Sequence, residues 1–419
     1  MTHHHDLPLG KIDRCQVCGG RNLHDVIDLG HQPPCDSLLR PEHLDQVELT
    51  YPLRFRVCRD CSLAQIDYVV APDVLFFAEY PYRSGITPML VEKLSTTAVS
   101  TLKHFNFPQG TLCIDIGSND GTVLKAFKDR GMRVLGVEAT NIAKIANEAG
   151  IETVQAFFNE ELAAKILESH GPAGSIAATN VFAHISELGS VMRGVSKLLM
   201  DGGVFVTESH YLLDLLETCQ YDSIYHEHLR YYSLKSLIRL FDQYDFTVTD
   251  VERIGNYGGS IRAFACKGRG LPVSPSVGKL LAAEEAAGIY GTAVYDKFAD
   301  QVRRVRRDLL ALLVNARLEG RTVAGIGCPG RSSTLLNYTG VDPDLMPYIA
   351  EQSTSLKLGL FLPGMHIPIV DERRIFDEQP DYAVMLSWHY AEPIVRKLRE
   401  KGLRSKIVLP LPEVRVYED

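Results

Sequence analysis

Two glycine-rich turns, each between an apolar run and a helical stretch, constrain most strongly what this chain can fold into. The first lies in TLCIDIGSNDGTVLKAF, residues 111–127, and the second in RTVAGIGCPGRSSTLLNYTG, residues 321–340. A buried strand that runs into a glycine turn and then a helix is the building unit of doubly wound parallel sheets. Two such units predict an α/β chain with two separate sheets of this kind.

The first turn has the pattern D-x-G-x-x-x-G, formed by Asp115, Gly117 and Gly121. This is not the G-x-G-x-x-G fingerprint of dinucleotide-binding turns. It resembles instead the first motif of class I S-adenosylmethionine (SAM) methyltransferases, whose glycines let the backbone approach the methionine part of the cofactor. We therefore expect SAM at this turn, with Asn119 and Asp120 among its contacts.

A second expected strand, RVLGVEA at 133–139, ends in Glu138. A carboxylate at the tip of such a strand can accept hydrogen bonds from both ribose hydroxyls of a nucleoside. Phe157 and Phe158 stand where an adenine ring could stack, although packing in the core explains them equally well. Asn180 follows the next expected strand and completes the predicted cofactor site.

The second turn does contain G-x-G-x-x-G, as Gly325, Gly327 and Gly330, and the acidic Glu351 follows about 20 residues later. A glycine turn at a helix N-terminus attracts phosphate of any kind, and Arg331 adds a cation directly behind it. The stretches LKLGLFLPGMHIPIV and PDYAVMLSW predict further strands of the same sheet. The turn therefore indicates a phosphate-bearing ligand, and on its own it is also consistent with NAD.

Four of the nine cysteines form two C-x-x-C pairs, Cys15 with Cys18 and Cys58 with Cys61, each followed by a small residue. Such pairs look like the two knuckles of a zinc ribbon, and four sulfurs close the coordination sphere of a structural zinc ion. The 39 residues between the knuckles exceed the usual spacing, so an insertion must pack between them. A thioredoxin-like redox motif is the alternative.

Composition excludes several classes of protein. A chain of 419 residues predicts two or three domains, and a net charge of −8 gives no basic footprint for nucleic acid. No apolar run approaches the roughly 20 residues that span a bilayer, and MTHHHDLPLG lacks the hydrophobic region of a secretory signal. We expect a cytoplasmic enzyme with no membrane association.

The segment YDSIYHEHLRYYS, residues 221–233, combines four tyrosines, two histidines, an arginine and two acids without an amphipathic period. Tyrosine and histidine at this density are suited to general acid–base chemistry. They are equally suited to an ordinary polar interface.

The chain as a whole resembles the zinc-containing nucleotide-sugar C-methyltransferases that make branched deoxysugars. The motifs that carry the resemblance follow one another along essentially all 419 residues: AEYPYRSG (78–85), DIGSNDG, NVFAHI, YDSIYHEHLRYYS, GIGCPGRSSTLLNY and LFLPGMHIPI. The chain departs from many members in carrying Arg331 in place of lysine, and from some in carrying Tyr257 in place of histidine and His226 in place of aspartate.

The resemblance implies three parts. These are a zinc-binding module at 1–72, a SAM-dependent methyltransferase domain with a Rossmann-like sheet at 73–267, and a second Rossmann-like domain, for a nucleotide sugar, at 268–419.

The implied reaction is methyl transfer from SAM to C3 of a 4-keto-deoxyhexose linked to a nucleoside diphosphate. Such a carbon becomes nucleophilic only when a base removes its proton and a donor stabilises the enolate. The resemblance assigns the base to His228, with His184 as its rival, and assigns donation toward the enolate or positioning of the sugar to Tyr225. Glu227 is expected to orient the imidazole or to hold a sugar hydroxyl.

Further contacts are expected around these groups, and His210 and His226 are expected to be surface or structural residues. Tyr80 and Tyr82 are predicted to close the other side of the site, with Tyr82 also at the cofactor. The predicted substrate contacts are Glu208, for which a capping role is the alternative, Tyr257, Arg262, Gly327, Arg331, Ser332, Ser333 and Lys357.

Two other functions remain open at this level. One is an NAD-dependent nucleotide-sugar oxidoreductase, and the other is a zinc-ribbon methyltransferase that modifies RNA or protein. We expect a monomer that acts on a dTDP- or GDP-linked sugar and binds no nucleic acid.

Overall fold

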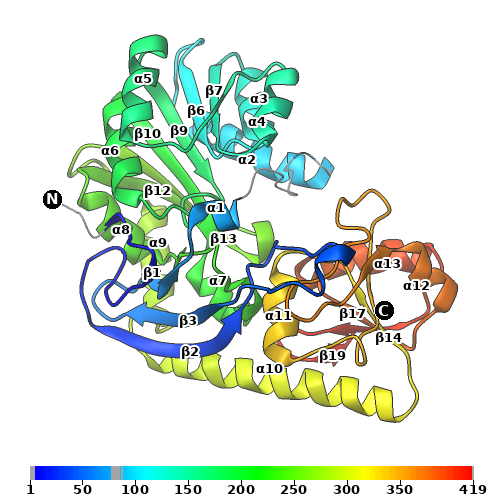
Figure 1. Ribbon diagram of the computed structural model, residues 1–419. Helices are drawn as coiled ribbons and strands as arrows, with labels where there is room; N and C mark the ends of the chain where they lie inside the picture. The colour runs from blue at the N-terminus through cyan, green and yellow to red at the C-terminus, as the bar shows by residue number, and fades with distance from the viewer. Residues whose placement is uncertain (1–4, 77–84, 86–87, 418–419) are drawn as a thin grey trace.

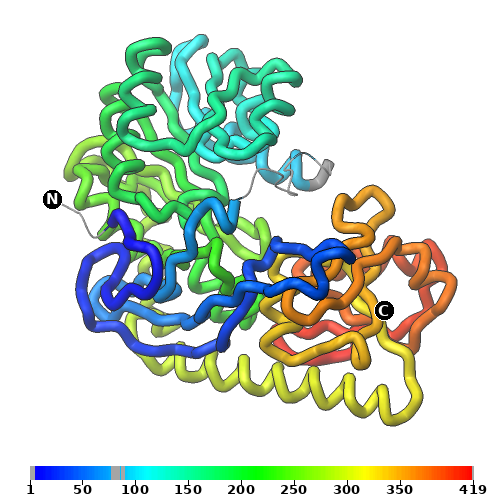
Figure 2. Tube along the Cα trace, viewed as in Figure 1, coloured from blue at the N-terminus to red at the C-terminus, as the bar shows by residue number. Residues whose placement is uncertain are grey.

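The computed structural model describes residues 5–76, 85 and 88–417, and its strands form three larger sheets and one two-stranded ribbon. Figure 1 shows the central sheet above, the N-terminal sheet below it, and the C-terminal sheet beside both. The tube in Figure 2 shows the N-terminal residues, in blue, running from the N-terminal sheet toward the C-terminal part of the chain.

The N-terminal sheet has four strands in the order β11-β4-β3-β2, and one of them comes from far along the chain. Strand β11 (Arg230–Tyr231) pairs antiparallel with β4 through Arg230 and Gln65, so the segment 221–233 is hydrogen-bonded into this sheet. The other elements of this part are β1 (Gly10–Lys11), β2 (Leu23–Gln32), η2 (Pro41–His43), β3 (Tyr51–Cys58), β4 (Ala64–Ile66), β5 (Tyr68–Val69) and α1 (Pro72–Leu75).

The central sheet has seven strands in the order β12-β13-β10-β9-β6-β7-β8, parallel from β10 to β8 and antiparallel at β13 and β12. Strand β6 is buried along its whole length, as expected for a parallel strand covered on both faces. The strands are β6 (Leu112–Ile116), β7 (Arg133–Glu138), β8 (Thr153–Gln155), β9 (Ala173–Thr179), β10 (Leu199–His210), β12 (Phe246–Ile254) and β13 (Ser260–Lys267). The helices and turns are α2 (Pro88–His104), α3 (Thr122–Lys128), α4 (Ile142–Glu148), α5 (Glu160–His170), α6 (Leu188–Leu198), α7 (Leu212–Glu217), η4 (Tyr221–Ser223), α8 (Leu234–Asp242) and η5 (Asn256–Gly258).

The C-terminal sheet has the order β16-β15-β14-β17-β18-β19, parallel except at β19. The first strand in sequence lies in the middle in both sheets, and the chain reverses direction across the sheet there, which places ligands at the carboxyl ends of the strands. The elements are α9 (Pro275–Ala286), α10 (Ala293–Leu318), β14 (Val323–Ile326), α11 (Arg331–Thr339), β15 (Ile349–Glu351), β16 (Ile369–Asp371), α12 (Arg373–Glu378), β17 (Tyr382–Met385), η6 (Trp388–Tyr390), α13 (Ala391–Glu400), β18 (Lys406–Leu409) and β19 (Arg415–Val416).

The α/β fold class is confirmed, but one expected strand is wrong. Turns at 356–359 and 363–365 interrupt the segment 356–370, and strand β16 begins only at Ile369. Glycines at 359 and 364 and the left-handed residue His366 (φ 54°) interrupt the apolar run. Phe361 makes only isolated bridges, to Leu39 and Pro368.

Helix α10 connects the parts. Its 26 residues span about 39 Å and run below β2 toward the C-terminal sheet (Figure 1). One face is buried at helical spacing, for example at Val302, Val305 and Leu309, while the arginines between them are exposed.

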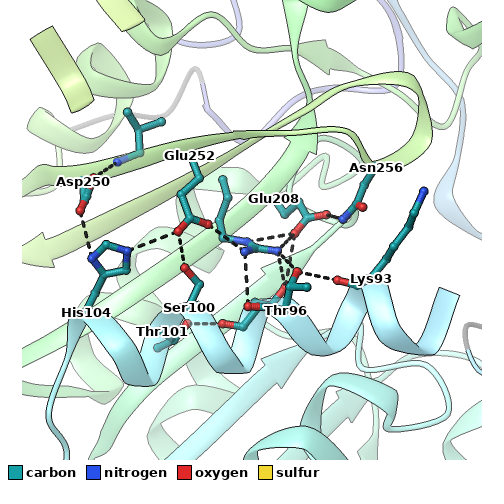
Figure 3. A network of polar contacts seen from close by, with 12 residues as sticks. Lys93, Thr96, Ser100, Thr101, His104, Glu208, Asp250, Glu252 and Asn256 are labelled. Carbon is teal, nitrogen blue, oxygen red and sulfur yellow. Dashed lines mark hydrogen bonds and ion pairs between the residues drawn. The ribbon is translucent and has the colours of Figure 1, made fainter. Parts of the chain in front are cut away.

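A buried ion cluster holds α2 against the edge of the central sheet. Arg262 is 1% exposed and lies opposite Glu208 on β10 and Glu252 on β12, so the three side chains form one row across three strands. The guanidinium contacts each carboxylate at 2.9 Å and donates to the Thr96 hydroxyl of α2 at 2.8 Å. Figure 3 shows this network along α2, ending at Asn256, whose amide donates to Glu208 at 2.9 Å.

We expect Arg262→Met to lower the free energy of unfolding by about 3–5 kcal/mol, because the buried Glu208 carboxylate would lose its cation. Urea unfolding measures this. The matched control is Arg269→Ala, which removes an exposed pair with Asp242 and should cause no measurable loss. Adding Glu208→Gln to Arg262→Met should restore part of the stability, and failure of that recovery would contradict this account.

Candidate active site

The four paired cysteines form one compact cluster. The Sγ atoms of Cys15 and Cys61 lie 3.5 Å apart, as do those of Cys18 and Cys58, and all four lie within 4.8 Å of one another. This matches the sulfur spacing around a tetrahedral zinc ion with Zn–S bonds of about 2.3 Å. None of the four lines the cavity described below, so a zinc ion there is structural.

The residue that follows each C-x-x-C pair lets the chain turn so that both sulfurs of the pair face the same point. Gly19 (φ 73°) and Ser62 (φ 60°) both adopt the left-handed conformation that turns the chain back over the sulfurs. The backbone N–H groups of Val17 and Cys18 point at the Cys15 sulfur, both at 3.4 Å.

A cavity of about 800 Å³ lies between the central and C-terminal sheets, at the carboxyl ends of their strands. At its first end, Glu138 forms the tip of β7, and its carboxylate accepts the Asn119 N–H at 2.9 Å and the Thr140 N–H at 2.8 Å. Gly117 (φ 70°) lines the same end, and a Cβ there would lie 2.3 Å from Val181. The turn therefore leaves room for a nucleoside ligand, with Glu138 in position for ribose hydroxyls.

The other predicted cofactor residues divide into two groups. Asn180 (φ 57°), Phe157 and Phe158 line the cavity, with Phe157 57% exposed and Phe158 packed into the core. Asp115 and Asp120 do not line it.

Asp115 and Asp120 support the turn from behind. Asp115 is buried, and burial together with the Glu138 charge raises its pKa well above the usual value. Its Oδ1 has no hydrogen-bond partner within the described part of the chain. Asp120 accepts the Gly85 N–H at 2.8 Å and the Thr122 hydroxyl at 2.7 Å. A Cβ at Gly121, likewise outside the lining, would press on Ile151 at 3.1 Å.

The second end of the cavity repeats the arrangement of the first. Glu351 forms the tip of β15, and its carboxylate accepts the Cys328 N–H at 2.7 Å, as Glu138 accepts the Asn119 N–H. Arg331 and Lys357 line this end, and the Lys357 ammonium lies 3.2 Å from Asp36. A carboxylate with two nearby cations suits the ribose and phosphates of a second nucleotide.

Several residues predicted to contact substrate lie elsewhere. Ser332 and Ser333 are buried outside the lining, and their N–H groups already donate within the turn, to Pro329 and Gly330. Gly327 also lies outside the lining, where a Cβ would be 2.5 Å from the Ser387 hydroxyl.

Glu208 and Arg262 form the buried pair behind α2 and do not face the cavity. Their expected substrate contact does not fit this placement, because each is occupied by the other. Tyr257, however, does line the cavity, and it holds a left-handed conformation (φ 53°). Tyr80 and Tyr82 lie outside the described residues.

All three parts of the chain hold the segment 221–233 at the centre of the cavity. The Ser233 hydroxyl donates to the Ser62 carbonyl in a cysteine knuckle, and the Leu229 N–H donates to Ala183 of the central part. From the C-terminal part, the Thr334 hydroxyl donates to the Ile224 carbonyl at 2.9 Å.

The imidazole of His228 is buried, at 5% exposure, and it lines the cavity. Its Nδ1 lies 2.8 Å from the Ser223 carbonyl, which only accepts, so Nδ1 carries the hydrogen and Nε2 has a free lone pair. Burial lowers the pKa of His228 well below its usual value, which keeps the ring neutral at pH 7. A neutral imidazole with a fixed tautomer can act as a base.

Three rings surround His228: Tyr225, His210 and His184, with ring centroids at 4.0, 4.7 and 4.8 Å. Burial lowers the pKa of His184 to about 4, so this ring is also neutral at pH 7. The hydroxyl of Tyr225 has no hydrogen-bond partner among the described residues.

Glu227 does not orient the imidazole, contrary to one of its two expected roles. The Ser223 carbonyl does so, while Glu227 accepts the thiol hydrogen of Cys35 at 3.4 Å. Glu227 does line the cavity beside Tyr225, so the second expected role, holding a sugar hydroxyl, fits its position.

The cavity residues that sequence reasoning missed include His210, His389 and Asp36. His210 ends β10 and His389 follows β17, so the rule that ligands lie beyond the strand carboxyl ends could have found both. His226 is structural, as expected, with its Nε2 on the Pro52 carbonyl at 3.3 Å. Nothing in the sequence around Asp36 indicates that the insertion between the knuckles reaches the site.

Three family models match the chain in order: a zinc binding domain at residues 15–76, a methyltransferase domain at 66–251, and a C-methyltransferase C-terminal domain at 255–412. The C-methyltransferase NovU of Streptomyces niveus is 36% identical over 410 residues, 97% of each chain.

Solved structures with some likeness include two SAM-dependent methyltransferases. The one from Anabaena variabilis is 20% identical, covering 42% of this chain and 85% of its own (TM-score 0.33). The one from Clostridium acetobutylicum is 13% identical, covering 42% and 92% (TM-score 0.34). Within the described residues, no helix is both long and apolar enough to cross a membrane.

We expect elemental analysis to find about one zinc ion per chain, and Cys58→Ser to lose most of it, because a serine hydroxyl is a poor zinc ligand. The matched control is Cys266→Ser, a cysteine outside the cluster, which should keep its zinc. Unchanged zinc in Cys58→Ser would contradict the assignment.

Proposed function

Because this chain belongs to the family of zinc-containing, SAM-dependent C-methyltransferases, we propose that its acceptor is a 4-keto-deoxyhexose linked to a nucleoside diphosphate. The family uses SAM, carries a structural zinc site and transfers a methyl group to carbon. The methylated carbon that we propose for this chain is C3, beside a C4 ketone, and the roles of single residues given below belong to the same proposal.

The observation that carries the proposal is the state of His228. Its Nδ1–H is committed to the Ser223 carbonyl, so Nε2 is the basic nitrogen, and it belongs to a ring that lines the cavity. A carbon beside a ketone becomes nucleophilic only when such a base removes its proton. When bound, SAM supplies the electrophilic methyl group that this carbon requires.

The neighbours of His228 are suited to the remaining tasks. The Tyr225 hydroxyl can donate to the enolate oxygen, since burial raises its pKa well above the usual value and keeps it protonated. Glu227 can hold a sugar hydroxyl. His184, whose ring centroid lies 4.8 Å from that of His228, can position the sugar.

The two ends of the cavity offer separate binding places for SAM and for the nucleoside diphosphate of the substrate. We assign SAM to the end formed by Gly117, Asn119 and Glu138, and the nucleoside diphosphate to the end formed by Glu351, Arg331 and Lys357. Either dTDP or GDP suits these groups. The net charge of −8 disfavours RNA as the acceptor and favours a small-molecule substrate. A cytoplasmic, monomeric enzyme is part of the same proposal.

The test is deuterium exchange and methyl gain on dTDP- and GDP-4-keto-6-deoxyhexoses in heavy water, followed by mass. We expect His228→Asn to lower both at least about 100-fold while SAM binding remains, because the amide keeps a donor for Ser223 but offers no base. His226→Gln, which keeps a donor for Pro52, is the control and should stay active. No exchange and no methyl gain in the wild type with either nucleotide would reject the proposed acceptor.

A pair of substitutions tests the assignment of the two ends. We expect Glu138→Gln to weaken binding of S-adenosylhomocysteine about 10- to 100-fold and leave the free nucleotide unaffected, because a charge-assisted hydrogen bond to ribose is lost. Glu351→Gln should do the reverse. Calorimetry with S-adenosylhomocysteine, dTDP and GDP measures both. If Glu351→Gln binds both nucleotides normally, the second assignment is wrong.

A further inference from the structure

The proposed reaction leaves a proton on a buried nitrogen, and that proton must depart before the next turnover. The Nδ1–H of His228 stays on the Ser223 carbonyl, so the abstracted proton enters and leaves through Nε2. With His228 only 5% exposed, bulk water has little access to it, and a neighbouring group has to take the proton. This inference rests on the proposed function.

His210 is placed to be that group. It is the last residue of β10 and lines the cavity. Its side chain is half-buried, whereas that of His228 is buried. The two ring centroids are 4.7 Å apart, close enough for a direct contact or one bridging water. Neither ring nitrogen of His210 makes a hydrogen bond within the described residues, so both are open to the cavity.

The charge state of the two rings is compatible with transfer. Burial, with the positive charge of Arg331 and the presence of His184, lowers the pKa of His210 to about 3. The same causes lower the pKa of His228. Both are therefore neutral at pH 7, and His210 can accept a proton briefly without trapping it.

A further imidazole belongs to the same cavity. His389 of η6 lines the cavity from the C-terminal side, and its pKa is lowered by burial, Arg331, His210 and Lys93. It lies against Tyr390, whose ring the Lys93 ammonium of α2 covers at 4.5 Å.

The other neighbour, His184, offers a less open route. Its ring stacks on Phe76 of the α1 end, with centroids 6.0 Å apart and planes 21° apart. A phenyl ring there cannot accept a proton.

We infer that His210 is the proton relay of this site. After the C–H bond of the sugar breaks and its electron pair enters the enolate, His228 Nε2 holds the proton. His228 then passes it to His210, directly or through one water, and His210 releases it to water in the cavity. Both imidazoles return to their neutral forms, and no other reactant is needed.

The test separates proton escape from proton abstraction. Exchange of the sugar C–H for deuterium, measured with S-adenosylhomocysteine in place of SAM, requires the abstracted proton to escape to solvent. Single-turnover methyl transfer requires only abstraction. For His210→Gln we expect exchange to fall at least about 10-fold relative to single-turnover methylation, since the trapped proton returns to the sugar.

A second variant tests whether the loss of exchange has a structural cause instead. In His210→Ala, added imidazole should raise the exchange rate in proportion to its concentration, an effect that a merely structural role would not give. His184→Gln is the matched comparison and should not lower exchange selectively.

An unchanged ratio of exchange to methylation in His210→Gln, absence of imidazole rescue, or a selective loss in His184→Gln would each overturn the relay. If the wild type neither exchanges nor methylates either sugar nucleotide, the proposed function itself fails. That result is distinct, because the relay fails only when wild-type chemistry is present.

Discussion

The site depends on one pairing, the antiparallel ladder between β11 and β4. Without it the segment 221–233 would be held to the N-terminal part mainly by side-chain hydrogen bonds, such as the one from the Ser233 hydroxyl to the Ser62 carbonyl. With it, the segment that carries His228 is fixed on one side by the N-terminal sheet, on another by Ala183, and on a third by Thr334 of α11. A base that must meet its substrate within a fraction of an ångström needs support from several directions. The structural zinc cluster is therefore part of the support of the active site, although it lies outside the cavity.

Local patterns predicted a large share of this molecule. The knuckles at Cys15 and Cys58, the turn at Gly117 and the carboxylate at Glu138 each depend on a few neighbouring residues, because a left-handed turn or a strand tip is a local property. The proposed base, His228, could be named only because its segment resembles a block of the C-methyltransferase family. The second glycine turn was also placed correctly at a strand–helix junction.

What the sequence did not reveal depends on which faces meet after folding. Glu208 and Arg262 looked like polar residues at strand ends, but their cross-strand register turns them toward α2 and toward each other. Ser332 and Ser333 follow the turn closely, yet the helix rotates them into its buried side. Asp36 reaches the cavity only through the packing of whole sheets, which no local pattern encodes, whereas His210 at the end of β10 could have been found from its place at a strand tip.

The late position of β11 has a consequence for synthesis of the chain. Strand β4 is made early, but its partner at 230–231 leaves the ribosome only after the whole central parallel core, strands β6 to β10, has been translated. Until then the N-terminal sheet has an open edge, the kind of edge that pairs wrongly with other chains. Metal capture by the four cysteines, all within the first 61 residues, is available during that interval. Zinc can thus act as an early clamp that keeps the nascent sheet in register until its last strand arrives.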